Sequence, residues 1–238
     1  AAKEPEIEAL CHFLLKMGSD IKGIGTDQII VVGQKTLNAD IEHDIIPDRI
    51  EAGTFIMAAV ITKSKITLNN ININHIESIL VNLKQVGLKI SKKSETSITV
   101  YNDDEIKPLN IKTDVYPGFP TDMQPQWIAL MALSIGESII EDTIYHDRFA
   151  HIPELIRLGA KISLNENLAT VLGVKKLVSA DVMCTDLRAG AALVLAALAS
   201  YGTTYISRIY HVDRGYENFE DKLELLGVDI KRDKVNVG

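Results

Sequence analysis

The sequence predicts an α/β (α+β) fold, an inside-out α/β barrel of repeated βαβαββ units with buried central helices. One observation is a leucine-rich stretch that recurs around Gly18, Gly87, Gly159 and Gly227, which are 69, 72 and 68 residues apart. A period of this length indicates one supersecondary unit used several times. The other observation is the helical segment 189–199, which has no polar face and must therefore be buried on every side.

The first full unit shows how the elements follow one another. A helix is expected over residues 49–61. A second, amphipathic helix has apolar residues at positions 76, 79, 80 and 83, the i, i+3, i+4, i+7 spacing of one helix face. Gly87 should end it, because the left-handed C′ position favours glycine. Strands are expected at residues 44–46, 65–71, 88–90 and 97–101.

The same order of elements is expected twice more, with first helices at residues 123–135 and 187–200. The predicted repeat domain covers residues 47–238, in units of about 47–110, 111–181 and 182–238. Residues 1–46 are expected to hold the last helix and hairpin of another domain. The chain begins without methionine and enters a helix at once, so we expect the later part of a longer protein.

The net charge of −7 argues against broad binding of nucleic acid, which requires a basic face. No apolar run is long enough to span a membrane, and no signal peptide is recognisable. Cys11 and Cys184 lie in apolar surroundings, without a CxxC pair or a His/Cys cluster at metal spacing. These features predict a cytoplasmic protein with reduced thiols and with neither metal nor cofactor.

Each buried helix begins with an acid: Asp48, Asp122 or Asp186. Aspartate is a strong N-cap, so capping alone explains any one of them about as well as a functional role does. A threefold repeat would, however, bring three helix N-termini to one end of the domain, where free N–H groups and positive dipole ends attract anions. A carboxylate held there could also accept a proton from a substrate hydroxyl.

Residues 145–148 and 210–214 both begin with Tyr-His and end in arginine. The equivalent stretch of the first unit, 70–75, has no arginine, which favours function over a need of the scaffold. Arg188 lies in the first turn of a buried helix, where a cation opposes the helix dipole, so an anionic partner is expected. Three arginines are interpreted as a clamp for a carboxylate or phosphate: Arg148, Arg188 and Arg214.

Several long motifs, in the same order, resemble the C-terminal half of the enolpyruvyl transferases. They are Glu4-Pro5-Glu6-Ile7, residues 47–54, Phe119-Pro120-Thr121-Asp122-Met123-Gln124, residues 148–155, Thr185-Asp186-Leu187-Arg188-Ala189 and residues 208–217. The resemblance runs almost from end to end of the chain. It implies a protein of two domains, each built of three such units, with the active site in the cleft between them.

The resemblance also implies a reaction, the transfer of the enolpyruvyl group of phosphoenolpyruvate to the 3-hydroxyl of UDP-N-acetylglucosamine in peptidoglycan synthesis. It implies that Asp122 contacts that hydroxyl as general base and that Asp186 lies near the reacting carbon. The other matching positions are Thr121 and Ile144 for the nucleotide sugar, Arg148, Arg188 and Arg214 for phosphoenolpyruvate, and Asp48 in the first unit. The implied partner is an N-terminal half with a catalytic lysine and a loop Cys or Asp.

The sequence departs from the family pattern in three ways. Residues 145–147 are Tyr-His-Asp where Phe-Glu-Asn is usual, and Gly190 stands where serine is usual. The catalytic lysine and the loop acid have no counterpart, so little or no turnover is expected from the isolated chain. Two other hypotheses remain open: an enzyme like the shikimate-pathway enolpyruvyl synthase, which shares the fold, and a non-catalytic binding fragment.

Overall fold

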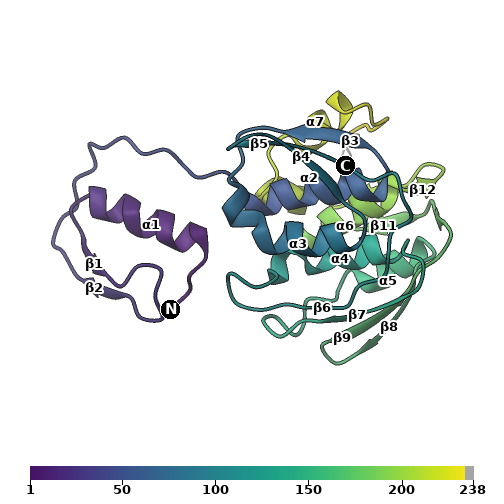
Figure 1. Ribbon diagram of the computed structural model, residues 1–238, viewed down its shortest axis with the longest axis horizontal. Coiled ribbons are helices and arrows are strands. Elements are labelled where there is room, and N and C mark those ends of the chain that lie inside the picture. Colours follow the sequence, from purple (N-terminus) through teal and green to yellow (C-terminus); the bar gives the residue numbers. More distant parts are fainter. Residues whose placement is uncertain (234–238) are drawn as a thin grey trace, which may run out of the picture.

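The computed structural model describes residues 1–233, and Figure 1 shows their arrangement. The α-helices are α1 (Pro5–Lys16), α2 (Arg49–Ile61), α3 (Glu77–Gln85), α4 (Gln124–Met131), α5 (Ile152–Arg157), α6 (Leu187–Leu198) and α7 (Phe219–Leu225). The short 3-10 helices are η1 (Ile73–Ile76), η2 (Thr121–Met123) and η3 (Ile209–Arg214). The strands are β1 (Asp20–Lys22), β2 (Ile30–Val32), β3 (Lys65–Leu68), β4 (Lys89–Ser94), β5 (Ser97–Tyr101), β6 (Ile111–Lys112), β7 (Glu137–Glu141), β8 (Lys161–Asn165), β9 (Leu168–Leu172), β10 (Leu177–Val178), β11 (Asp181–Met183), β12 (Ser200–Tyr201) and β13 (Tyr205–Ser207).

Helices α2, α4 and α6 form the centre of the main body and pack on one another (Figure 1). Met57, Trp127 and Leu193, one from each helix, are inaccessible to solvent. A helix that is apolar on all sides has to be enclosed in this way, because burying apolar surface contributes about 25 cal/mol per Å². The predicted α/β class with buried central helices is confirmed.

Small sheets surround these helices. The larger two have the strand orders β3-β5-β4 and β6-β7-β9-β8. The parallel pairs β6–β7 and β11–β13 are each joined through a buried helix, α4 or α6. With the pairs β1–β2 and β10–β12, the sheets of residues 1–233 remain separate and do not join into one closed barrel.

The recurring glycine ends a helix in each of its four copies. The N–H of Gly87 donates to Lys84 O at 3.3 Å, and that of Leu88 donates to Leu83 O at 2.9 Å. These are the two bonds of a Schellman motif, and the same pair follows α1, α5 and α7. All four glycines have φ between 93° and 120°, where a side chain would be strained. The prediction of C′ glycines is therefore confirmed.

Some predicted boundaries are wrong. Residues 44–46 form no strand, because this segment crosses from the α1 side to the main body without a neighbouring strand (Figure 1), and Ile45 is exposed. Helix α4 ends at Met131, before residue 135, because the chain tightens into a turn in which the N–H of Leu133 donates to Leu130 O at 3.2 Å. Strand β3 and helix α6 also end before residues 71 and 200.

Helix α1 and the β1–β2 hairpin lie to one side of the main body (Figure 1). Arg49 Nε of α2 donates to Glu6 Oε1 of α1 at 2.8 Å across this boundary. The assignment of residues 1–46 to a separate domain, and the unit boundaries within 47–238, remain predictions. No strand closes the third unit within residues 228–233, and its last five residues lie outside the described part of the chain.

Candidate functional site

Two of the three acids at the helix starts are N-caps. Asp48 Oδ1 accepts the N–H groups of Ile50 and Glu51, at 2.7 and 2.9 Å. Asp186 Oδ1 accepts those of Arg188 and Ala189, at 2.8 and 2.9 Å. Capping is thus sufficient to explain the presence of both residues.

Asp122 is different, because it caps no helix and lies within the 3-10 turn η2. One carboxylate oxygen accepts from Arg148 Nη1, and the other accepts from Arg188 Nη2 at 3.0 Å. Burial alone would raise the pKa of Asp122, but the charges and hydrogen bonds of Arg188 and Arg148 outweigh it and hold the pKa below its usual value. Asp122 is therefore ionised at neutral pH.

The anionic partner expected for Arg188 is this carboxylate. Burial would lower the pKa of Arg188, but the charge of Asp122 prevails and raises it. Arg148 also lies over the ring of Tyr145, with its Cζ atom 5.2 Å from the ring centroid. A tyrosine ring offers a cation the same kind of face as a phenylalanine ring, so tyrosine in place of the family's usual phenylalanine is compatible with this contact.

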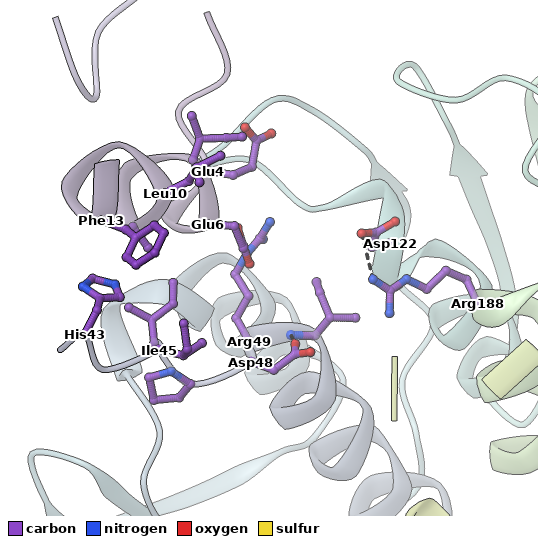
Figure 2. Close-up of a pocket in the computed structure, with 15 residues that line it drawn as sticks. Glu4, Glu6, Leu10, Phe13, His43, Ile45, Asp48, Arg49, Asp122 and Arg188 are labelled. Atoms are coloured by element: carbon purple, nitrogen blue, oxygen red, sulfur yellow. Dashed lines mark hydrogen bonds and ion pairs between the residues drawn. The ribbon is translucent and has the colours of Figure 1, made fainter. Parts of the chain in front are cut away.

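A hollow of about 640 Å³ opens beside this cluster, between α1 and the first turns of the buried helices (Figure 2). Leu10 and Phe13 of α1 lie on one side, and Asp122 and Arg188 lie on the other. Asp48 also lines the hollow, so the predicted meeting of three helix starts at one end of the domain is confirmed. A smaller hollow of about 120 Å³ adjoins it.

Thr121 and Ile144 line the smaller hollow together with Asp122. Both are held by Asp142, a fully buried residue that sequence reasoning missed. Thr121 Oγ1 donates to Asp142 Oδ2 at 2.7 Å, and the N–H of Ile144 donates to Oδ1 at 3.1 Å. The available signal was an acid directly after the half-apolar strand β7.

Arg49 was missed as well, although the argument that singled out Arg188 applies to it. It too is a cation in the first turn of a buried helix, and Glu6 is its anionic partner. Arg214, in contrast, is exposed at the end of η3 and is not brought to Asp122. The cluster therefore contains two of the three predicted arginines, and Arg214 remains a predicted third arm.

Two other buried side chains, His151 and Cys184, are unsuited to proton transfer or nucleophilic attack. Burial lowers the pKa of His151 to about 3, so its ring is neutral. Burial also raises the pKa of Cys184 to about 11. Within residues 1–233, no group of three His, Cys, Asp or Glu side chains is placed to hold a metal ion. No helix in the same part of the chain is long and apolar enough to cross a membrane.

The fold and the site define an α/β protein with an acid–arginine cluster at the ends of three buried helices. Residues 1–223 match the family model of EPSP synthase (3-phosphoshikimate 1-carboxyvinyltransferase), and the chain belongs to this family of enolpyruvyl transferases.

Curated relatives carry a more specific name. The chain is 51% identical over 232 residues to UDP-N-acetylglucosamine 1-carboxyvinyltransferase of Campylobacter lari. The matched region covers 97% of this chain and 55% of that protein. The protein of the same name from Geobacter metallireducens is 50% identical over 234 residues, with coverages of 98% and 56%. The chain thus spans about half the length of the curated relatives it matches.

Solved structures agree on the fold. The enolpyruvyl transferase NikO from Streptomyces tendae superposes with a TM-score of 0.84 and 27% identity, over 96% of this chain and 54% of that one. EPSP synthase from Acinetobacter baumannii gives a TM-score of 0.70 at 18% identity, over 93% and 54%, and shows the likeness of fold alone.

Proposed function

We propose that this chain is the C-terminal portion of an enzyme that transfers the enolpyruvyl group of phosphoenolpyruvate to the 3-hydroxyl of UDP-N-acetylglucosamine and releases phosphate. The observation that carries the proposal is the Asp122 carboxylate held between Arg148 and Arg188 at the edge of an open hollow. The names of the relatives support the sugar nucleotide as acceptor. The reaction would serve peptidoglycan precursor synthesis in the cytoplasm.

Phosphoenolpyruvate carries a carboxylate and a phosphate, both of which suit the planar guanidinium fork. Arg148 and Arg188 would bind these groups, with Arg214 as a third arm. The acceptor hydroxyl gives its proton to Asp122, and its oxygen bonds to C2 while C3 takes a proton from an acid in the other half of the enzyme. Loss of phosphate from C2 and of a proton from C3 then restores the double bond.

The two arginines also control the basicity of Asp122. In the structure their charge lowers its pKa, which makes the carboxylate a weak base. An anionic substrate on the same guanidinium groups would offset part of that charge, so the pKa of Asp122 would rise when phosphoenolpyruvate binds. The base would thus gain strength only when both reactants are in place.

The remaining predicted residues have supporting positions. Thr121 and Ile144 line the smaller hollow beside Asp122, where the sugar nucleotide would lie. Asp186 and Asp48 each cap a buried helix through Oδ1, and Asp186 is assigned a place near the reacting carbon. Thr185 donates to the second oxygen of Asp186 at 3.3 Å.

The test is to mix this chain with a separately expressed N-terminal half of the Campylobacter lari relative and to measure phosphate release. The chain alone should give little or no turnover, the mixture should be active, and a mixture with Asp122→Asn should be inactive. Robust turnover by the chain alone would refute the need for a second half. A stable but inactive complex would favour a non-catalytic fragment.

Calorimetric titration of the mixed halves separates the two candidate acceptors. UDP-N-acetylglucosamine should bind, and shikimate 3-phosphate should not. The reverse result would place the chain with the shikimate-pathway enzymes that give the family its name.

A further inference from the structure

The boundary between residues 1–46 and the main body is crossed by very few polar contacts. Helix α1 and the β1–β2 hairpin lie to one side (Figure 1), and residues 33–48, which lead from β2 to α2, contain no helix or strand. Within residues 1–233, the bond from Arg49 Nε to Glu6 Oε1 is the one hydrogen bond or ion pair that joins the two parts. The polar connection across the boundary therefore depends on this pair.

Arg49 is the fixed partner of the two. Its side chain is 8% exposed, and its Cζ atom lies 5.6 Å from the centroid of the Tyr116 ring. It lies in the first turn of α2, where the helix dipole opposes a cation and a buried charge needs an anionic partner. Glu6 is 48% exposed and belongs to the smaller part. The main body thus presents a buried cation, and the more exposed carboxylate holds α1 against it.

The pair also lies at the junction of the two hollows. Glu6 and Arg49 meet between α1 and the start of α2 (Figure 2). Both line the larger hollow, and three residues line the larger and the smaller hollow alike: Glu4, Arg49 and Asp122. Glu4 directly precedes α1, two residues before Glu6. The position of α1 therefore decides where Glu4 lies relative to the candidate base Asp122.

We propose that Glu6 and Arg49 are positioning residues, whose ion pair sets the distance of α1 from the buried helices and so the width of the hollow beside Asp122. Two parts of a chain that share a small interface move relative to one another unless specific contacts hold them. Loss of the pair leaves a buried guanidinium without its partner and a connection without regular structure. The consequence for catalysis rests on the proposed function, whereas the position of α1 can be measured on this chain alone.

The experiment measures the distance between α1 and the main body by pulsed electron paramagnetic resonance. Spin labels are placed at Lys16→Cys on α1 and Lys84→Cys on α3, which are both exposed positions. The native Cys11 and Cys184 are buried and stay unlabelled in the folded chain. The parent chain should give one narrow distribution. Glu6→Gln, which keeps the shape of the side chain and removes its charge, should broaden that distribution toward longer distances.

Glu6→Lys is the stronger test of the ion pair. It places a second cation against the buried Arg49, so like charges repel where opposite charges attracted, and the distribution should broaden more than in Glu6→Gln. The side chain of Glu6 is half exposed, so both variants should fold. Arg49 itself is left in place, because its burial would make a substitution there disturb the main body as well.

The matched control is Glu8→Gln, the same change on the same helix at a residue that takes no part in the contact across the boundary. It should leave the distribution as in the parent chain. A second pair of labels, at Lys84→Cys and Lys161→Cys, spans the main body alone and should give the same distance in every variant. An unchanged α1 distance in Glu6→Lys, or equal broadening by Glu8→Gln, would overturn the proposal.

The mixed-halves assay adds a kinetic reading. A hollow of altered width should lower kcat/KM for UDP-N-acetylglucosamine by roughly tenfold in Glu6→Lys, because misplaced groups no longer meet the substrate in the productive geometry. If the parent halves show no activity but the distances shift, the proposed function fails and the positioning role stands. If the parent halves are active but the distances do not shift, the positioning role alone fails.

Discussion

Arg188 Nη2 donates to Asp122 Oδ2 at 3.0 Å, although the two residues are 66 positions apart and lie at the starts of different buried helices. The contact exists because α4 and α6 pack side by side and begin at the same end of the domain. It explains how a cation can lie in the first turn of α6, where the helix dipole opposes it. The carboxylate supplies the compensating charge.

This ion pair should make stability depend on pH. The folded-state pKa of Asp122 lies below its ordinary value of 3.8, so its contribution is present above that value and is lost as pH falls through the folded pKa. Urea unfolding should show Asp122→Asn to be less stable than the parent chain at neutral pH. The difference should narrow as the pH falls below 3.8 and passes through the folded-state pKa. Asn at the exposed position Asp147 is the control, and a gap that stays constant with pH would contradict the assignment.

The three acids at the helix starts should behave as two classes. Asp48→Ala and Asp186→Ala each remove an acceptor for two backbone N–H groups and should cost about 1 kcal/mol of unfolding free energy. Asn at either position should restore most of that loss, because it can cap as well. Asp122→Asn should instead abolish activity in the mixed halves. If Asn at position 122 preserved the unfolding free energy at neutral pH as well as Asn does at positions 48 and 186, the distinction would be wrong.

The sequence predicted the four C′ glycines well, because a Schellman motif depends only on neighbouring residues. It also indicated that the central helices are buried, because a helix that is apolar on every side has to be enclosed by other elements. It could not distinguish Asp122 from Asp48 and Asp186. All three precede a buried helix, and their difference depends on arginines supplied by distant segments.

The role of Asp142 was also missed because it depends on contacts between segments that are distant in the sequence. In the sequence it is one acid after a short strand, and acids at strand ends are common on surfaces. Its importance appears only when four donors from three segments converge on one buried carboxylate. These donors are the Thr113 and Thr121 hydroxyls and the N–H groups of Ile144 and Tyr145.

Replacement of Asp142 by Ala should therefore cost about 3 kcal/mol, because several donors lose their acceptor inside the protein. The loop that carries Ile144 should also lose its position, so calorimetry on the mixed halves should show weaker binding of UDP-N-acetylglucosamine. Thr121→Val removes one of these bonds and should cost about 1 kcal/mol. An Asp142→Ala variant with unchanged urea unfolding would rule out this role.

One departure from the family pattern, glycine in place of serine at position 190, is explained by packing. A Cβ atom built on it would lie 2.5 Å from Val212 Cγ2 and 2.9 Å from Cys184 Sγ, closer than side chains approach one another. Gly190→Ala should therefore destabilise the chain by about 1–3 kcal/mol in urea unfolding. Serine, the usual family residue, should cost at least as much here.

The cause can be checked by a double-mutant cycle with Val212→Ala, which removes the nearer obstacle. If the clash is responsible, the two substitutions together should be less destabilising than the sum of their separate effects by at least about 0.5 kcal/mol. Ala132→Gly on the fully buried Ala132, in the turn after α4, gives a comparison for the effect of a buried methyl group without this clash. Strict additivity of Gly190→Ala and Val212→Ala would mean that glycine is present for a reason other than the space taken by Val212.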